Sequence, residues 1–368
     1  MGAEFCEDAE RGLLSRDEGA WVARVDAELS NVRGAWHRAV EDGRLDVAAR
    51  ITVALGEFAF HRSRSELWEQ ARALAAHPGL ERSPLAAAVL GEAAHSAWLQ
   101  GELAEAERFA TRGLELADPG DPSLWRCWES MGMVLTFSND FPAAERAFLR
   151  AVDELRLGPQ EAAAARALAA RPRLYRGDIE GARALVALAR PAADAAGRLS
   201  LMAAVRCVQG EVEMAADPAG ALAPLREAIE LARPVGAVFL EQVAAMTLLD
   251  VYDRLGDRAA ALALYPGLLR HWERSGHRLQ QWMLHGLAGV LAGLGRLEDT
   301  AVLLAAAGAI TGPAPMTAGD ADRLRTLDAR AAEALGADAY ARARAAGAAL
   351  TPAGMLDFAR AAIARATA

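Results

Sequence analysis

The chain has 368 residues, of which 53% are hydrophobic, 24% charged and 6% aromatic, and its formal net charge is −9. This acidic balance argues against a nonspecific nucleic-acid surface. The three cysteines, Cys6, Cys127 and Cys207, lie far apart and lack the spacing of metal ligands, which suits a reducing compartment better than a disulfide framework. We therefore expect a cytoplasmic protein with no metal or other cofactor and no direct nucleic-acid partner.

The amino-terminal part of the chain contains several helical patterns. Apolar residues recur every three or four positions from Glu18 to Val40, and a second helix is expected from Asp46 to Phe60. Shorter helices are expected over Ser65–Ala75 and Pro84–Leu99. Residues 1–80 are thus predicted to form a helical cap together with the first hairpins.

A regular repeat occupies residues 81–310. Successive turns are 38, 38, 39, 40 and 39 positions apart, and each turn is followed four residues later by a small side chain. Such periodicity indicates stacked helical hairpins, none of which can bury its apolar face alone. The turns lie at Gly101-Glu102, Asn139-Asp140, Gly177-Asp178, Ala216-Asp217, Gly256-Asp257 and Gly295-Arg296, and the small residues are Ala106, Ala144, Ala182, Ala221, Ala261 and Thr300.

The carboxyl-terminal part departs from this repeat. Residues 311–318 form a Gly/Pro-rich linker, and its glycines and prolines also make the uncharged run of residues 301–319 a poor membrane span. Residues 319–368 are expected to form a helical cap with helices over 320–335, 338–346 and 351–366. The predicted fold is therefore an all-α superhelical solenoid with a helical cap at its carboxyl end.

Two features resemble known families. Residues 128–135 (WESMGMVL), followed by Ala144 and Ala151, resemble a tetratricopeptide repeat, although the period near 39 exceeds that repeat's usual 34 residues. This longer period is more similar to the superhelical sensor domain of maltose-regulator type. The resemblance implies a right-handed superhelix whose concave groove binds a protein or a small-molecule inducer.

The two ends of the chain resemble parts of large actinobacterial regulators. Residues 21–35 (WVARVDAELSNVRGA) look like the segment that joins a signal-transduction ATPase core to helical repeats, in proteins with LuxR-type, antibiotic-regulator or nucleotide-cyclase effector domains. Leu335-Gly336, Tyr340, Gly347 and Leu350-Thr351 match the same group near the carboxyl end. The resemblance implies an attached or cognate ATPase or DNA-binding domain. We expect the chain to be part of such a regulator.

The first helix of each hairpin is expected to line the groove, so its inward positions are the candidate binding residues. Tryptophan, arginine and methionine there are residue types enriched at binding surfaces. Two simpler interpretations remain open: the tryptophans lie in the core, and Arg126 and Arg206 pair with Glu129 and Glu211. The candidates are His95, Trp98, Arg126, Glu129, Met133, Arg171, Arg206, Met246, Asp250, Trp282 and His285.

The motifs of catalysis are missing from the sequence. Without lysine there is no phosphate-binding loop, and neither a His-Glu-x-x-His motif nor a Gly-x-Ser-x-Gly motif occurs. His271, His277 and His285 are six and eight positions apart, which does not repeat a helical turn. We expect a non-catalytic sensor module that is able to form homodimers through its solenoid ends. The alternatives are a free-standing scaffold for two proteins and an all-α enzyme that uses the groove as its active site.

Overall fold

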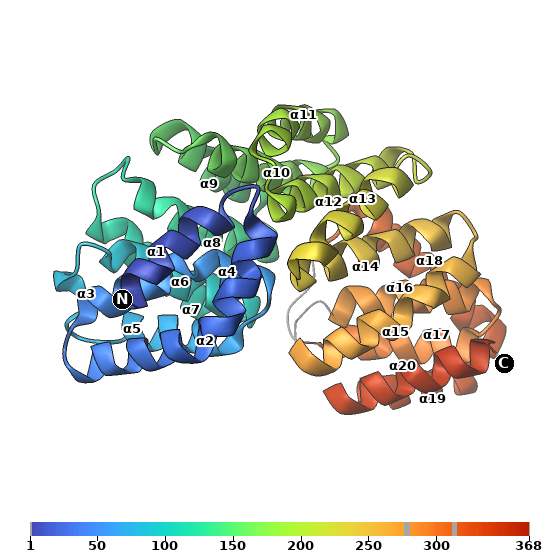
Figure 1. The fold of residues 1–368 in the computed structure, drawn as a ribbon. Helices are drawn as coiled ribbons and strands as arrows, with labels where there is room; N and C mark the ends of the chain where they lie inside the picture. Colours follow the sequence, from blue (N-terminus) through green and yellow to red (C-terminus); the bar gives the residue numbers. More distant parts are fainter. Residues whose placement is uncertain (1, 276–279, 311–314, 368) are drawn as a thin grey trace. The chain divides into compact units, whose positions relative to one another are not determined.

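The computed structural model describes residues 2–275, 280–310 and 315–367, and within these ranges every regular element is helical (Figure 1). The predicted all-α class is therefore confirmed. In the same ranges, the helices lack the combination of length and apolar composition that crossing a lipid bilayer requires. The first ten helices are α1 (Gly2–Leu13), α2 (Glu18–Glu41), α3 (Leu45–Ala54), α4 (Gly56–His61), α5 (Ser65–Ala75), α6 (Ala86–Leu99), α7 (Leu103–Leu116), α8 (Trp125–Phe137), α9 (Phe141–Glu154) and α10 (Pro159–Tyr175). The others are α11 (Ile179–Ala196), α12 (Leu199–Ala216), α13 (Leu222–Ala232), α14 (Val238–Arg254), α15 (Arg258–Ser275), α16 (Gln280–Gly293), α17 (Leu297–Ala309), α18 (Ala318–Leu335), α19 (Ala337–Ala348) and α20 (Pro352–Thr367), and three short 3-10 segments are η1 (Leu80–Arg82), η2 (Pro122–Leu124) and η3 (Arg233–Val235).

Neighbouring helices pack as hairpins. α6 packs against α7, α8 against α9 and α16 against α17, and α6 also contacts α8, the first helix of the next hairpin. All six small residues predicted to follow the turns are fully buried. Small side chains at these positions let the helix axes approach to the distance that ridge-into-groove packing requires.

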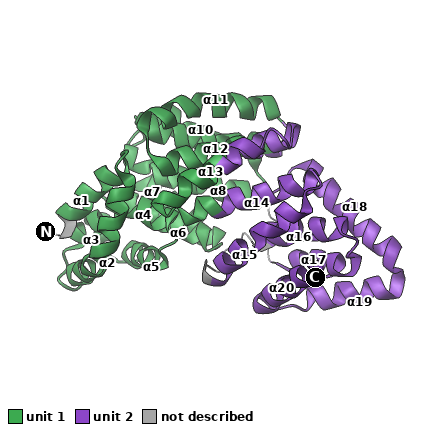
Figure 2. Cartoon of the chain, turned by 45° about the vertical axis from the view of Figure 1, so that its right-hand side comes forward, with its two compact units in different colours: residues 1–174, 178–209, 227–241 green, residues 175–177, 210–226, 242–368 purple. Residues whose placement is uncertain are grey.

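The chain divides into two compact units (Figure 2). Unit 1 comprises residues 1–174, 178–209 and 227–241, and unit 2 comprises residues 175–177, 210–226 and 242–368. Each unit is assembled from separate stretches of the chain. The candidate binding residues are consequently divided between the units, with seven in unit 1 and Met246, Asp250, Trp282 and His285 in unit 2.

Many of the turns that join the helices contain a residue in the left-handed backbone conformation. Gly101 has a φ of 79°, its N–H donates to the carbonyl of Trp98, and the next N–H donates to the carbonyl of Ala97. These bonds satisfy the last carbonyls of α6, and glycine adopts the required φ without a steric penalty. Ser63 occupies the corresponding position between α4 and α5 with a φ of 51°, where the sequence has Arg62-Ser63-Arg64.

Replacing Ser63 with glycine is expected to stabilise the fold by about 1 kcal/mol, because a non-glycine residue pays a penalty in the left-handed region. The serine hydroxyl is also buried without a hydrogen-bond partner, so nothing favourable is lost. The matched control is Gly101→Ser, which should destabilise by a similar amount. Urea unfolding followed by circular dichroism measures both changes. A loss of stability in Ser63→Gly would contradict this assignment.

Two elements differ from the prediction. α1 precedes the first predicted helix, and the helix predicted over residues 46–60 is interrupted at Leu55, which separates α3 from α4. The interruption lies where another helix comes close: a Cβ added to Gly56 would lie 2.2 Å from a carboxylate oxygen of Glu92 on α6. Glycine at the start of α4 therefore allows the Glu92 carboxylate to approach the α4 backbone.

Unit 1 brings its amino-terminal helices against segments far along the chain. The Gln160 side chain donates to the carbonyl of Leu14 at 2.9 Å, and the Ser200 N–H donates to the carboxylate of Glu18 at 2.9 Å. α2 also contacts η3. The start of the chain thus packs against Ser200 and against η3, which lie in the two later stretches of unit 1.

Candidate functional site

α6 and α8 bring four of the candidate residues together in unit 1. His95 and Trp98 are three positions apart on α6, and Arg126 and Glu129 are three apart on α8, so each pair shares one helix face. The two helices approach closely at Gly91, where an added Cβ would lie 2.6 Å from the Cβ of Arg126. The close approach places the side chains of both helices in a common cluster.

Arg126 is the centre of a group that we call the polar cluster. Its guanidinium donates to the carboxylates of Glu129 and Glu57, and its Nε donates to Glu92 at 3.1 Å. Arg126 and Glu129 are only 8% and 6% exposed, so these ion pairs are removed from water. The predicted pairing of Arg126 with Glu129 is confirmed, but two further carboxylates share the same guanidinium. The polar cluster consists of Glu57, His61, Glu92, Arg126, Glu129 and Arg198.

Arg198 enters the polar cluster from the turn that precedes α12. Gly197 has a φ of 66° and ends α11, and Arg198 follows it directly. The guanidinium donates to Glu57 and, through Nε, to the hydroxyl of Ser200 at 3.0 Å. Because Arg198 lies 141 positions after Glu57, this ion pair joins distant segments of unit 1.

Burial and the two arginines set the pKa values of the carboxyl groups in opposite directions. Burial alone would raise the pKa of Glu129, but Arg126 outweighs it and holds that pKa at about 2. Burial likewise opposes ionisation of Glu57, yet Arg126 and Arg198 hold its pKa well below the ordinary value. For Glu92 burial prevails over Arg126, and the pKa is raised. Burial lowers the pKa of His61 despite its contact with Glu57.

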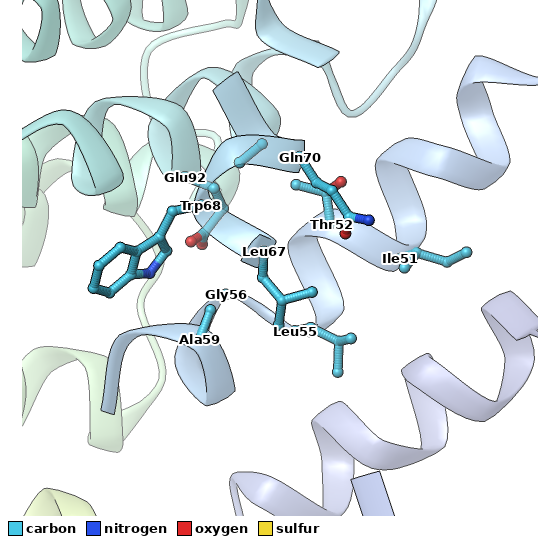
Figure 3. Close-up of a pocket in the computed structure, with 10 residues that line it drawn as sticks. Ile51, Thr52, Leu55, Gly56, Ala59, Leu67, Trp68, Gln70 and Glu92 are labelled. Carbon is cyan, nitrogen blue, oxygen red and sulfur yellow. The ribbon is translucent and has the colours of Figure 1, made fainter. Parts of the chain in front are cut away.

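These opposite shifts follow from the charge balance of the polar cluster. Three carboxyl groups face two guanidinium groups, so the cluster is neutral when Glu92 carries a proton and His61 does not. Glu92 also lines a small cavity with space for about one water molecule, beside Thr52 and Gln70 (Figure 3). The Glu92 carboxyl group therefore contacts both the Arg126 guanidinium and this cavity.

An aromatic cluster adjoins the polar cluster, formed by Phe60, His95, Trp98, Phe137 and Phe239. The His95 ring meets the Phe60 ring edge-on with centroids 4.6 Å apart and lies 5.4 Å from the Trp98 ring. Phe239, at the start of α14 but within unit 1, packs 4.9 Å from Phe60 and 6.5 Å from Trp98. Half-buried rings of Phe60 and Phe239 thus lie beside the buried rings of His95 and Trp98.

His95 and Trp98 have buried nitrogens without hydrogen-bond partners. Both ring nitrogens of His95 and Nε1 of Trp98 are out of reach of solvent and unbonded. The closest carboxylate oxygen to His95 Nδ1 belongs to Glu129 at 3.6 Å, which is too long for a hydrogen bond. An unsatisfied buried donor costs about 1–3 kcal/mol, so two adjacent ones lower the stability of the fold.

Substitution of Trp98 with phenylalanine tests this lack of a partner. Trp36 is the matched control, because it is also buried but donates from Nε1 to the hydroxyl of Thr52 at 2.9 Å. We expect Trp98→Phe to lower the free energy of unfolding by about 1–2 kcal/mol less than Trp36→Phe does, since only the latter breaks a hydrogen bond. Urea unfolding of both variants gives the comparison. Equal losses would mean that the Trp98 indole has a partner.

The candidate residues of unit 1 are less exposed than expected. Inward positions of a solenoid were expected to be open to solvent, but His95 and Trp98 are only 2% and 8% exposed, as buried as the two α8 residues. α4, Arg198 and Phe239 pack over this face and exclude water from it. Met133, on the same face of α8, is half-buried.

The remaining candidates lie in other groups. Arg171 is half-buried on α10. Arg206 pairs with Asp194 at 2.7 Å and with Glu227 at 2.9 Å.

In unit 2, Asp250 accepts from Arg254 at 3.0 Å and from Arg323 at 2.8 Å. Burial lowers the pKa of His285 to about 4, although Asp250 opposes the shift. Trp282 donates from Nε1 to the carbonyl of Pro315 at 3.1 Å, and Met246 is half-buried.

The histidines named in the sequence do not form a common site in the described ranges. His271 is buried on α15 and His285 lies on α16, while His277 is outside the described residues. Among the residues that the structure describes, no three His, Cys, Asp or Glu side chains are arranged to hold a metal ion.

Seven members of the two clusters were not predicted: Glu57, Phe60, His61, Glu92, Phe137, Arg198 and Phe239. Glu92 could have been predicted from the sequence, because it precedes His95 by three positions and therefore lies on the same helix face. Glu57 lies on the short α4, which periodicity merged with α3. Arg198 and Phe239 reach the site only through long-range packing. No protein-family model and no curated protein matches the chain.

Proposed function

We propose that this chain is a non-catalytic binding module, the sensor part of a cytoplasmic transcriptional regulator of signal-transduction ATPase type. Its ligand, an inducer or a protein partner, binds at the aromatic and polar clusters of unit 1. The observation that carries the proposal is the pair of adjacent, buried side chains His95 and Trp98, whose ring nitrogens lie beyond hydrogen-bond distance of any acceptor in the described residues. Unsatisfied donors are retained at a cost to stability, and a bound ligand that accepts from them recovers that cost.

The packing around these residues supports a sensing role. Arg198 and Phe239 cover the site and come from segments more than one hundred positions away from α4. Ligand entry must therefore alter contacts between distant parts of unit 1. A ligand that favours the altered arrangement by about 1–3 kcal/mol would bias an attached or cognate ATPase or DNA-binding domain between its states.

A ligand screen by thermal unfolding tests the proposal. A cognate molecule should raise the melting temperature, because a ligand at one hundred times its dissociation constant stabilises the folded state by about 2.7 kcal/mol. Trp98→Ala should reduce this shift, whereas the same substitution of half-buried Trp128 in another core cluster should not. Simultaneous capture of two proteins, with no stabilising small molecule, would favour a free-standing scaffold instead.

A further inference from the structure

The unpartnered nitrogens of unit 1 constrain the chemistry of the ligand. The indole Nε1 of Trp98 is only a donor, and the His95 ring carries at least one N–H donor in either of its protonation states. The two rings are neighbours, with centroids 5.4 Å apart. A ligand atom that satisfies them must be a hydrogen-bond acceptor, and one oxygen with two lone pairs is able to accept from both.

The charges nearby argue for an uncharged acceptor. In the adjoining polar cluster, the guanidinium groups of Arg126 and Arg198 are already in contact with the carboxyl groups of Glu57, Glu92 and Glu129. An anionic ligand would add a further negative charge to a buried site that has no cation to spare among these residues. A carbonyl oxygen of a ketone, ester or amide meets the requirement without that cost.

The aromatic cluster indicates the shape of the rest of the ligand. Phe239 is half-buried and its ring lies against the rings of Phe60 and Trp98. It comes from the start of α14, whereas Phe60 and Trp98 come from α4 and α6. A flat aromatic group of a ligand can take the place of the Phe239 ring with little change in the surrounding packing.

We propose that unit 1 binds an uncharged aromatic molecule whose carbonyl oxygen accepts hydrogen bonds from Trp98 and His95 and whose ring displaces Phe239. This assignment rests on the proposed function, since it specifies the ligand class for the same site. Phe239 serves in the free protein as a side chain that holds the place of the ligand ring.

Three probes of similar size test the assignment with the full chain: acetophenone, benzoate and ethylbenzene. They share a benzene ring and differ in carrying a neutral acceptor, a charged acceptor or no acceptor. We expect acetophenone to bind at least fivefold more tightly than either of the others, measured by ligand-observed NMR titration. Equal affinity for acetophenone and ethylbenzene would show that the ligand needs no hydrogen-bond acceptor. Tighter binding of benzoate would show that the ligand is charged rather than neutral.

Variants locate the binding site. Trp98→Phe keeps an aromatic ring but removes the donor, so it should weaken acetophenone binding about fivefold to tenfold. Trp128→Phe is the matched control and should leave the affinity unchanged. Phe239→Ala removes the competing ring and should tighten binding at least fivefold.

Unchanged affinity in Trp98→Phe, or absence of acetophenone binding at millimolar concentration, would overturn the assignment. The sensor proposal would then still stand if another molecule raised the melting temperature of the parent but not of Trp98→Ala. A chain that no molecule stabilises, and that joins two proteins, would contradict the sensor proposal itself.

Discussion

Replacing Arg126 with methionine is expected to lower the free energy of unfolding by about 3–5 kcal/mol, because removal of one partner leaves buried charges uncompensated. The Arg126 guanidinium contacts Glu57, Glu92 and Glu129, and burial opposes the ionisation of all three carboxyl groups. Methionine fills much of the same space without a charge, so the loss reports electrostatics rather than packing. Urea unfolding followed by circular dichroism measures the effect.

The control for this prediction is Arg108→Met. Arg108 also pairs with a glutamate three positions away on its helix, Glu105, but its side chain is 66% exposed. Exposed pairs contribute about 0–1 kcal/mol, so this variant should remain close to the parent. Adding Glu129→Gln to Arg126→Met should restore part of the lost stability, since one unpaired carboxylate is removed. Similar losses in the two methionine variants would show that the polar cluster contributes no more than a surface pair.

The polar cluster is also expected to make stability depend on pH in two opposite ways. Glu129 has its pKa lowered from 4.5 to about 2, so its contribution is fully present above pH 4.5 and is lost as the pH falls towards 2. Glu129→Gln should thus destabilise the fold at pH 7 by on the order of 3 kcal/mol, and the difference should vanish near pH 2.

The stability that Glu92 contributes depends on pH in the opposite direction. Its folded pKa is raised above 4.5, so the stability that it contributes is present below pH 4.5 and is lost as the pH rises through the raised value. Glu92→Gln mimics the protonated form and should stabilise the fold at pH 7 but not at pH 4. Unfolding free energies of the parent and both variants between pH 2.5 and pH 8 test the pair. If Glu129→Gln and Glu92→Gln changed the free energy of unfolding in the same direction at pH 7, the charge balance proposed for the polar cluster would be wrong.

Local sequence patterns predicted much of the fold. The helix predicted over residues 65–75 has those limits in the structure, and the glycine turns at Gly101, Gly177, Gly256 and Gly295 all have the left-handed φ that only glycine adopts freely. These features depend on residues that are neighbours in the chain. Trp36 was predicted to be buried, and it is buried in the structure. The spacing of the apolar residues in its helix identified the buried face.

The candidate site was predicted only in part, because its remaining members depend on contacts between distant segments. The break at Leu55 is linked to the approach of Glu92 to Gly56. Arg198 and Phe239 carry no local signal that relates them to α4. Trp128 was predicted to lie in the core, yet it is half-buried beneath the guanidinium of Arg150, 4.7 Å from its ring centroid. Local periodicity identified the helix faces that meet in the site but not the segments that cover them.

The indole N–H signal of Trp98 tests the central claim, that unit 1 holds an unpartnered donor reserved for a ligand. The eight tryptophans give eight indole signals in a proton–nitrogen NMR spectrum, and the one absent from Trp98→Phe belongs to Trp98. On titration with acetophenone this proton signal should move downfield, as a new hydrogen bond forms, while that of Trp36 stays in place. A Trp98 signal that remains fixed while other indole signals move would contradict the account.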